Sequence, residues 1–179
     1  SNVRGSVVGT GVERVWQGHM LIGLNLSSDA DWSEIQTRLK NCFGVAKFFP
    51  AHKVSRDVDS IRKILSEELP GRRFETFRIS AHRSDKRFQI TSSDLNRELG
   101  TFVIELTGAK VNLKFPDLEV FIDVLHDGIL VYFDELKGYG GMPVGVSGNT
   151  MALMSGGIDS PVAAWHMMKR GSHVKFAHF

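Results

Sequence analysis

The stretch Met151-Ala152-Leu153-Met154-Ser155-Gly156-Gly157-Ile158-Asp159-Ser160-Pro161 decides the fold of the C-terminal part of this chain. Thr150–Met154 is a short apolar run that suits a buried parallel strand. After the glycine turn, residues 161–170 have the composition of a helix, and His173–Phe179 that of a second strand. The order strand, glycine turn, helix, strand predicts the beginning of an α/β sheet.

The turn Ser155–Ser160 has the features of a phosphate-binding loop. Gly156 and Gly157 lack Cβ atoms, so the backbone can adopt unusual dihedrals and come close to a ligand. The N–H groups of the turn and of the first helical turn have no intrahelical partner, and the helix dipole adds positive charge there. The hydroxyls of Ser155 and Ser160 can donate to phosphate oxygens. We therefore predict an anion cradle at this turn.

Asp159 needs a separate explanation, because an acid beside bound phosphates repels them. A bridging Mg²⁺ is one explanation and a helix N-cap is the other. Pro161 fits the first helical turn, where its missing N–H is no loss. The Walker pattern and the dinucleotide pattern G-x-G-x-x-G are both absent. The remaining alternative, a plain strand-to-helix turn with capping serines, is disfavoured by two adjacent glycines flanked by serines.

A second irregular segment, Lys137–Gly145, lies just upstream and holds four glycines and one proline in nine residues. Such a composition predicts a linker or an irregular binding loop. Before it, the spacing of apolar residues alternates between helical and extended periods. In its first part we expect an extended Glu13–Leu26, then a helix and a short strand over Val45–Pro50. The helix has the apolar stripe Trp32, Ile35, Leu39 and Phe43, is capped by Ser28, Asp29 or Asp31, and is closed by Gly44.

A second helix follows, with the apolar stripe Val58, Ile61, Ile64, Leu65 and Leu69 and with Ser55 or Asp57 as its cap. After it we expect a half-buried strand at Phe77, Ile79 and Ala81 and a third helix from Thr91–Asp94 to Gly108. The block ends with an extended Lys110–Phe115 and a hairpin of Leu118–Leu125 and Ile129–Phe133.

The distribution of charge is more informative than its total, which is a formal net charge of +2. Between Arg72 and Arg87 there are six cations and two acids, whereas Phe115–Glu135 holds six acids and neither Lys nor Arg. A positive face suits a phosphate backbone. An ordinary solvated face with scattered charge is the alternative, and it stays open at this point.

The composition is that of a water-soluble globular protein, with 42% apolar and 23% charged residues. No run approaches the roughly 20 apolar residues of a membrane-spanning helix, and no secretion signal opens the chain. The single cysteine, Cys42, excludes an internal disulfide and suits a reducing cytoplasm. Its spacing places it beside Phe43 near a core rather than at a reactive site. We expect a cytoplasmic protein.

With these residues in place, the chain resembles a known family. Ser155-Gly156-Gly157-Ile158-Asp159-Ser160 is similar to the SGGxDS loop of PP-loop ATP pyrophosphatases. The block before it, with its cationic strand and the exit Gly138–Gly145, resembles the THUMP domain of the ThiI family of tRNA 4-thiouridine synthetases. Residues 14–50 resemble the rear half of the ferredoxin-like domain that precedes THUMP in that family.

The resemblance implies an α+β ferredoxin-like/THUMP module followed by the first β-α-β of an α/β PP-loop domain (adenine nucleotide alpha hydrolase-like). It divides the chain into residues 1–53, a partial ferredoxin-like domain; 54–136, an RNA-binding THUMP domain; 137–149, a linker; and 150–179, the front of the PP-loop domain.

The family also implies a function: adenylation of a tRNA uridine with ATP and Mg²⁺, followed by replacement of the activated oxygen with a persulfide sulfur from a cysteine desulfurase. Many members also serve thiamine thiazole synthesis. Carried over residue by residue, the resemblance implies an ATP site, with Asp159 also at the Mg²⁺, and a tRNA surface; the ATP residues are Ser155, Gly156, Gly157, Asp159 and Ser160, and the tRNA residues are Arg78, Arg83, Lys86 and Arg87.

Two departures from the family pattern limit these expectations. The opening strand and helix of the ferredoxin-like domain are not recognisable before Arg14, and the sulfur-relay cysteines would lie beyond Phe179. Cys42 lies in the wrong domain to replace them. We therefore expect a fragment, or a degenerate member, that is inactive alone. Three alternatives remain open: a stand-alone tRNA-binding module with a vestigial loop, a PP-loop ligase or amidotransferase that uses no RNA, and a homodimer instead of a monomer.

Overall fold

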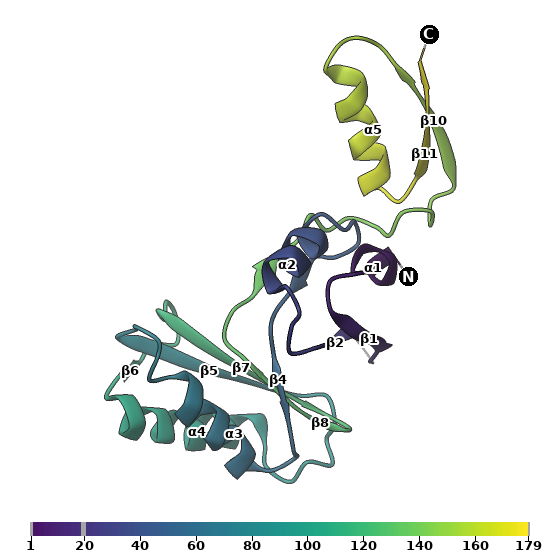
Figure 1. Cartoon of the computed structure of the whole chain (residues 1–179). Coiled ribbons are helices and arrows are strands. Elements are labelled where there is room, and N and C mark those ends of the chain that lie inside the picture. Colours follow the sequence, from purple (N-terminus) through teal and green to yellow (C-terminus); the bar gives the residue numbers. More distant parts are fainter. Residues whose placement is uncertain (1, 19–20, 179) are drawn as a thin grey trace. The chain divides into compact units, whose positions relative to one another are not determined.

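The structure is a computed structural model that describes residues 2–18 and 21–178 (Figure 1). Those residues form two compact units. The first unit contains residues 1–48 and 135–179, and the second unit contains residues 49–134. The second unit is therefore an insertion in the first along the sequence, and the two are described separately.

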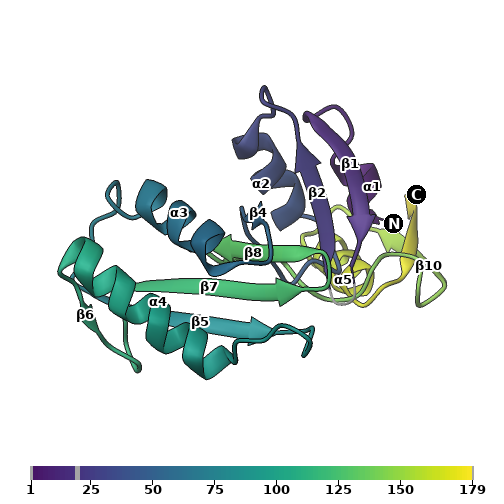
Figure 2. The same ribbon diagram turned by 90° about the horizontal axis from the view of Figure 1, so that it is seen from below.

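The second unit is a five-stranded sheet with the strand order β4-β8-β7-β5-β6. Strands β5 and β7 run parallel, with Ile79 opposite Val120, whereas β7 and β8 form an antiparallel hairpin. Both helices of the unit lie on the same face of the sheet (Figure 2). The elements are β4 (His52–Val54), α3 (Val58–Glu68), β5 (Thr76–Arg83), α4 (Ser92–Thr107), β6 (Lys110–Val111), β7 (Leu118–Leu125) and β8 (Gly128–Tyr132).

Strand β7 shows why the sheet has one covered and one open face. Val120, Ile122 and Val124 are fully buried, while Phe121 and Asp123 between them are part-exposed. This alternation follows from the two-residue period of a strand. The buried side chains join the apolar stripes of α3 and α4 in one core cluster. The core thus lies between the sheet and its two helices.

Helix boundaries in the second unit follow the expected capping residues. The Asp57 carboxylate accepts from the N–H of Ser60 at 2.7 Å, and the Thr91 hydroxyl accepts from the N–H of Asp94 at 3.1 Å. Gly108 ends α4 in the left-handed conformation, with φ +74°. Such side-chain caps satisfy N–H groups that have no partner within the helix.

The first unit is built from small pieces. A hairpin pairs β1 with β2, a short pair joins β3 to β9, and β10 lies parallel to β11. Helix α2, capped by Asp31, buries Ile35 and Leu39 against Val7. The elements are α1 (Asn2–Ser6), β1 (Val12–Gln17), β2 (Ile22–Leu26), α2 (Trp32–Lys40), β3 (Lys47–Phe48), β9 (Leu136–Lys137), β10 (Asn149–Met154), α5 (Asp159–Lys169) and β11 (His173–His178).

Three expectations from the sequence are wrong in detail. Helix α2 ends at Lys40, so Cys42 and Phe43 lie in the turn that follows it; Cys42 is buried, 8% exposed. Strand β10 is parallel to β11 as predicted but is not buried, since Met151 is 63% exposed; α5 packs on this pair of strands and leaves Met151 open to solvent. The extended Lys110–Phe115 contains only the two-residue strand β6.

Candidate nucleotide and nucleic-acid sites

The predicted phosphate loop connects β10 to the N-terminus of α5, as the strand-turn-helix order required. Its two serines lie together: the N–H of Ser155 donates to Ser160 Oγ at 3.1 Å, and the two hydroxyl oxygens are 3.3 Å apart. The N–H of Gly157 lies 3.4 Å from Ser155 Oγ. The turn is therefore closed on itself by its own hydroxyl groups, and it holds no side chain larger than serine between its ends except Ile158 and Asp159.

Neither glycine of the loop adopts an unusual backbone dihedral. Neither Gly156 nor Gly157 has a positive φ, contrary to our expectation. Both are exposed, and a Cβ on Gly156 would meet no atom within 4 Å. The turn leads directly into α5, which begins at Asp159. The first backbone N–H groups of a helix have no intrahelical acceptor, so they are suited to a phosphate.

Asp159 is the first residue of α5, and the N-cap position belongs to Ile158. Ile158 makes no side-chain capping hydrogen bond. The N-cap explanation for Asp159 is therefore wrong, since its carboxylate stands in the first turn instead. An acid there still interacts favourably with the helix dipole, and it is available to a cation.

The donor set fits ATP better than it fits a metal held by the protein alone. Within the described ranges, no group of three or more His, Cys, Asp or Glu side chains could hold a metal ion. Asp159 offers a single carboxylate. Because Mg²⁺ usually takes one or two carboxylates and completes its shell with phosphate oxygens and water, the loop fits Mg²⁺ only together with bound phosphates.

The four predicted tRNA residues are not equivalent in the structure. Arg78, on the open face of the sheet, forms a two-point ion pair with Glu119 and donates to Leu113 O at 2.8 Å. Arg83, at the end of β5, donates to Phe88 O at 2.8 Å and to Ile90 O at 3.0 Å. Both guanidinium groups are therefore used to hold the protein's own backbone and side chains.

Lys86 and Arg87 lie in the exposed turn after β5. Arg87 is paired with Asp85 through Nε at 3.0 Å. The side-chain hydrogen bonds from Arg87 hold the pKa of Asp85 well below its usual range. Lys86 is exposed and makes no ion pair with any residue of 2–18 or 21–178. Of the four predicted residues, Lys86 is thus the one whose charge is most accessible.

Sequence reasoning missed Arg56, which the fold brings to the same place. Its Nη2 lies 3.1 Å from Asp85, and its guanidinium stands over the ring of Phe88, 5.8 Å from the centroid. Its buried Nε has no hydrogen-bond partner in the part of the chain that the structure describes. The only signal in the sequence was its position directly before the cap Asp57. A hollow of about 370 Å³ opens here, lined by Arg56, Asp57, Val58, Arg87, Phe88, Gln89 and Ile90.

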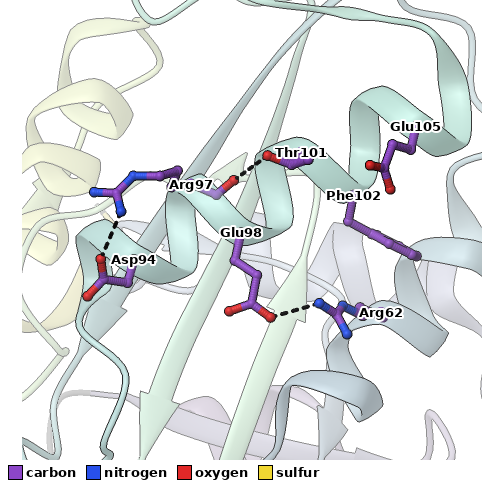
Figure 3. A pocket seen from close by; sticks show the side chains of 7 residues that line it. All are labelled: Arg62, Asp94, Arg97, Glu98, Thr101, Phe102 and Glu105. Atoms are coloured by element: carbon purple, nitrogen blue, oxygen red, sulfur yellow. Dashed lines mark hydrogen bonds and ion pairs between the residues drawn. The ribbon is translucent and has the colours of Figure 1, made fainter.

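A larger groove of about 650 Å³ lies along α4 and is not a phosphate site (Figure 3). Arg62 pairs with Glu98 at 2.8 Å, and Arg97 pairs with Asp94 at 3.3 Å (Figure 3). Glu105 adds a third acid to the lining, so the acids outnumber the arginines. This balance repels a phosphate backbone.

None of the helices described here is long and apolar enough to cross a membrane.

Comparison with known families gives matches to two parts of the chain. Residues 56–134 match the THUMP domain, and residues 145–179 match the family described as "Thiamine biosynthesis protein (ThiI)". The second unit is thus a THUMP domain, and β10, α5 and β11 are the start of a ThiI PP-loop domain, as the sequence predicted.

Similar proteins extend the match over the whole chain. A "Probable tRNA sulfurtransferase" of Thermus thermophilus is 41% identical over 179 residues, which is 100% of this chain and 44% of that protein. One of Finegoldia magna is 38% identical over 169 residues, covering 91% of this chain and 42% of that protein. The predicted resemblance to the ThiI family is confirmed, and this chain spans less than half the length of these relatives.

Solved structures give the same result. A crystal structure of a 4-thiouridine synthetase–RNA complex with bound ATP has a TM-score of 0.82 at 28% identity, covering 99% of this chain and 47% of that one. The structure of PH1313 from Pyrococcus horikoshii has a TM-score of 0.89 at 24% identity, covering 99% of this chain and 61% of that one, and supports the fold alone.

Proposed function

We propose that the complete gene product containing this chain is an ATP-dependent tRNA sulfurtransferase. In that reaction a tRNA uridine is adenylated with release of pyrophosphate, and the terminal sulfur of a persulfide then displaces AMP. A thiol next cleaves the remaining S–S bond, which releases 4-thiouridine and leaves a disulfide on the donor side. The observation that carries the proposal is the exposed glycine turn at the start of α5, in the same chain as a THUMP domain. The relative whose solved structure holds both RNA and ATP supports it.

The chain's own residues divide the work between the two units. Residues 155–160 would cradle the pyrophosphate portion of ATP through backbone N–H groups and the hydroxyls of Ser155 and Ser160. Asp159 would bind Mg²⁺ on those phosphates, and the ion would neutralise charge as pyrophosphate leaves. The tRNA would lie on the second unit, where Lys86, Arg87 and Arg56 would contact its phosphates while Arg83 holds the turn in place.

We further propose the domain division drawn from the sequence, a cytoplasmic location, and a cysteine desulfurase as the sulfur donor. A role in thiamine thiazole synthesis and homodimer formation are parts of the same proposal. The 179 residues hold one cysteine, Cys42, which is buried and is not proposed as a sulfur-relay residue. The 179-residue chain alone is therefore expected to bind its ligands without thiolating tRNA.

The test is tRNA-dependent ATP–pyrophosphate exchange by the complete gene product. Asp159→Ala should lower the exchange rate about 100-fold, the usual scale for removing one charge-stabilising group. Asp59→Ala is the matched control: Asp59 also stands in the first turn of a helix, α3, and its side chain is 90% exposed. Exchange that survives Asp159→Ala unchanged would overturn the site, and exchange without tRNA would favour a ligase that uses no RNA.

A further inference from the structure

Residues 138–148, which the sequence left as a linker or a loop, form a strap with defined contacts at both ends. At the front the strap lies against the turn after α2. The N–H of Tyr139 donates to Lys40 O at 3.0 Å, and the N–H of Gly140 donates to Val45 O at 2.9 Å. The strap therefore begins as an ordered segment fixed to the N-terminal part of the first unit.

At its rear the strap is fixed to the C-terminal end of α5. The N–H of Met142 donates to Lys169 O at 2.9 Å. The N–H groups of Gly145 and Ser147 donate to Gly171 O at 2.8 Å and 3.0 Å. Lys169 is the last residue of α5, where intrahelical donors run out, and Gly171 lies in the turn that follows. The strap thus connects the turn after α2 directly to the helix that starts at the phosphate loop.

Two glycines of the strap are required by backbone contact. A Cβ on Gly138 would lie 2.3 Å from Val45 O, and one on Gly141 would lie 2.2 Å from Lys169 O. Gly141 also has φ +79°, a region that side chains disfavour. At these two of the five glycines in residues 138–148, the absence of a side chain allows tight docking of the backbone.

Trp165 reinforces the same connection with its side chain. Its ring lies edge-on to Phe43, with centroids 5.4 Å apart, and edge-on to Tyr139 at 5.6 Å. Lys169 Nζ stands 5.1 Å from the centroid of the Trp165 ring. Phe43 comes from the turn after α2, Tyr139 from the strap, and Trp165 from α5, so one aromatic cluster joins all three segments.

We propose that the strap and Trp165 position the phosphate loop for nucleotidyl transfer. A helix transmits a displacement of one end to the other, so fixing the C-terminal end of α5 fixes residues 155–160 relative to the N-terminal part of the first unit. Misplacement of reacting groups by about 1 Å can cost about 100-fold in rate. Trp165 is therefore a positioning residue: its ring contacts Phe43 and Tyr139 and acts on the loop through α5. This inference rests on the proposed function.

The test separates turnover from binding in the complete gene product. Trp165→Ala should lower the kcat of tRNA-dependent pyrophosphate exchange about 10- to 100-fold and leave the KM for ATP within about twofold. Trp165→Phe, which keeps an aromatic ring in the cluster, should recover most of the rate. Gly141→Ala should reproduce the kcat loss from the strap side, and Gly5→Ala, whose added Cβ would meet nothing within 4 Å, is its control.

The outcomes are distinct from those of the proposed function. An unchanged kcat in Trp165→Ala, or a rise in KM for ATP that matches the loss of rate, overturns the positioning role. If the unaltered protein lacks exchange activity, the proposed function fails, and amide hydrogen exchange still tests the strap. Slow exchange at Met142, Gly145 and Ser147 then supports a fixed strap, whereas fast exchange overturns it.

Discussion

The phosphate loop and the basic turn after β5 were both predicted from short runs of sequence, and they differ in what their polar groups are doing. In the loop, Ser155 and Ser160 bond to each other, and the glycines between them are exposed and unobstructed. In the basic turn, Arg83 and Arg87 are already bonded to the protein. The shape of a glycine turn before a helix can be predicted from its residue types, whereas a cationic surface depends on which charges the fold has already paired.

The pairing of Arg78 with Glu119 shows the cause most clearly. The two residues are 41 positions apart and become neighbours only because β5 and β7 pair in parallel, with Arg78 directly opposite Glu119. A count of cations along the sequence cannot include that acid. The charge of Arg78 on strand β5, which the sequence presents as cationic, is therefore paired in the fold with an acid on the neighbouring strand β7.

The largest effect should come from the core that supports the second unit. Phe77→Ala should reduce the free energy of unfolding of the second unit by about 3–5 kcal/mol, because the side chain is fully buried and leaves a cavity. Denaturant unfolding measures the change. In Phe77→Ala, tRNA binding by the second unit should be lost while ATP binding at residues 155–160 persists. This difference would distinguish the two regions. Leu113→Ala, at a 68% exposed position, should change stability by less than about 0.5 kcal/mol.

The phosphate loop should respond to bulk without loss of folding. Gly156→Val should weaken ATP binding about 10- to 100-fold, since each charge-assisted hydrogen bond that the side chain blocks contributes about 1.5–3 kcal/mol. Isothermal titration measures the affinity. Gly71→Val is the control, because a Cβ there would meet only Glu68 O at 3.9 Å. Equal affinity in Gly156→Val and the unaltered protein would mean that phosphates do not approach this backbone.

The basic turn should show the difference between a free and a paired cation. Lys86→Ala should lower the slope of log affinity for tRNA against log salt by about 0.7–0.9, the value for one phosphate contact. Arg78→Ala should leave that slope unchanged, because Glu119 already neutralises Arg78. Filter binding across a salt series measures both. A slope change in Arg78→Ala as large as in Lys86→Ala would show that the ion pair opens when RNA binds.

The smallest effect should be a pH dependence at Asp85. Hydrogen bonds from Arg87 lower the pKa of this carboxyl from 3.8 in the folded state. A lowered folded pKa means that the contribution to stability is present above about pH 4 and is lost as the pH falls through the folded pKa. The difference in Tm between the unaltered protein and Asp85→Asn should therefore shrink on acidification. A difference that is constant from pH 7 to pH 3 contradicts this linkage.

Local chemistry made much of the fold predictable. The caps Asp57 and Thr91 and the left-handed Gly108 all lie where residue preference placed them, since each acts on backbone groups within a few positions. The strand-turn-helix order around residues 155–160 was predictable for the same reason. Strand β4 was not predicted, because its three residues are held in an extended conformation by pairing with β8, which lies far along the chain.

The rest of the site depended on contacts between distant residues. Arg56 was not proposed, because its neighbours Asp85 and Phe88 come from the turn after β5. The contacts of the strap were equally hidden, since glycine favours both flexible linkers and tight docking. The sequence suggested where the backbone would be irregular, and only the fold shows that Gly141 lies against the end of α5.

The bare face of β10 and β11 has a practical consequence for anyone who prepares this chain. Met151 and Leu153 alternate with the residues facing α5 and are 63% and 59% exposed, on a sheet of two strands. Exposed apolar strands with unpaired edges promote association between molecules. We therefore expect the purified 179-residue chain to self-associate as its concentration rises, and Met151→Lys, which places a charge on that face, to keep it dispersed.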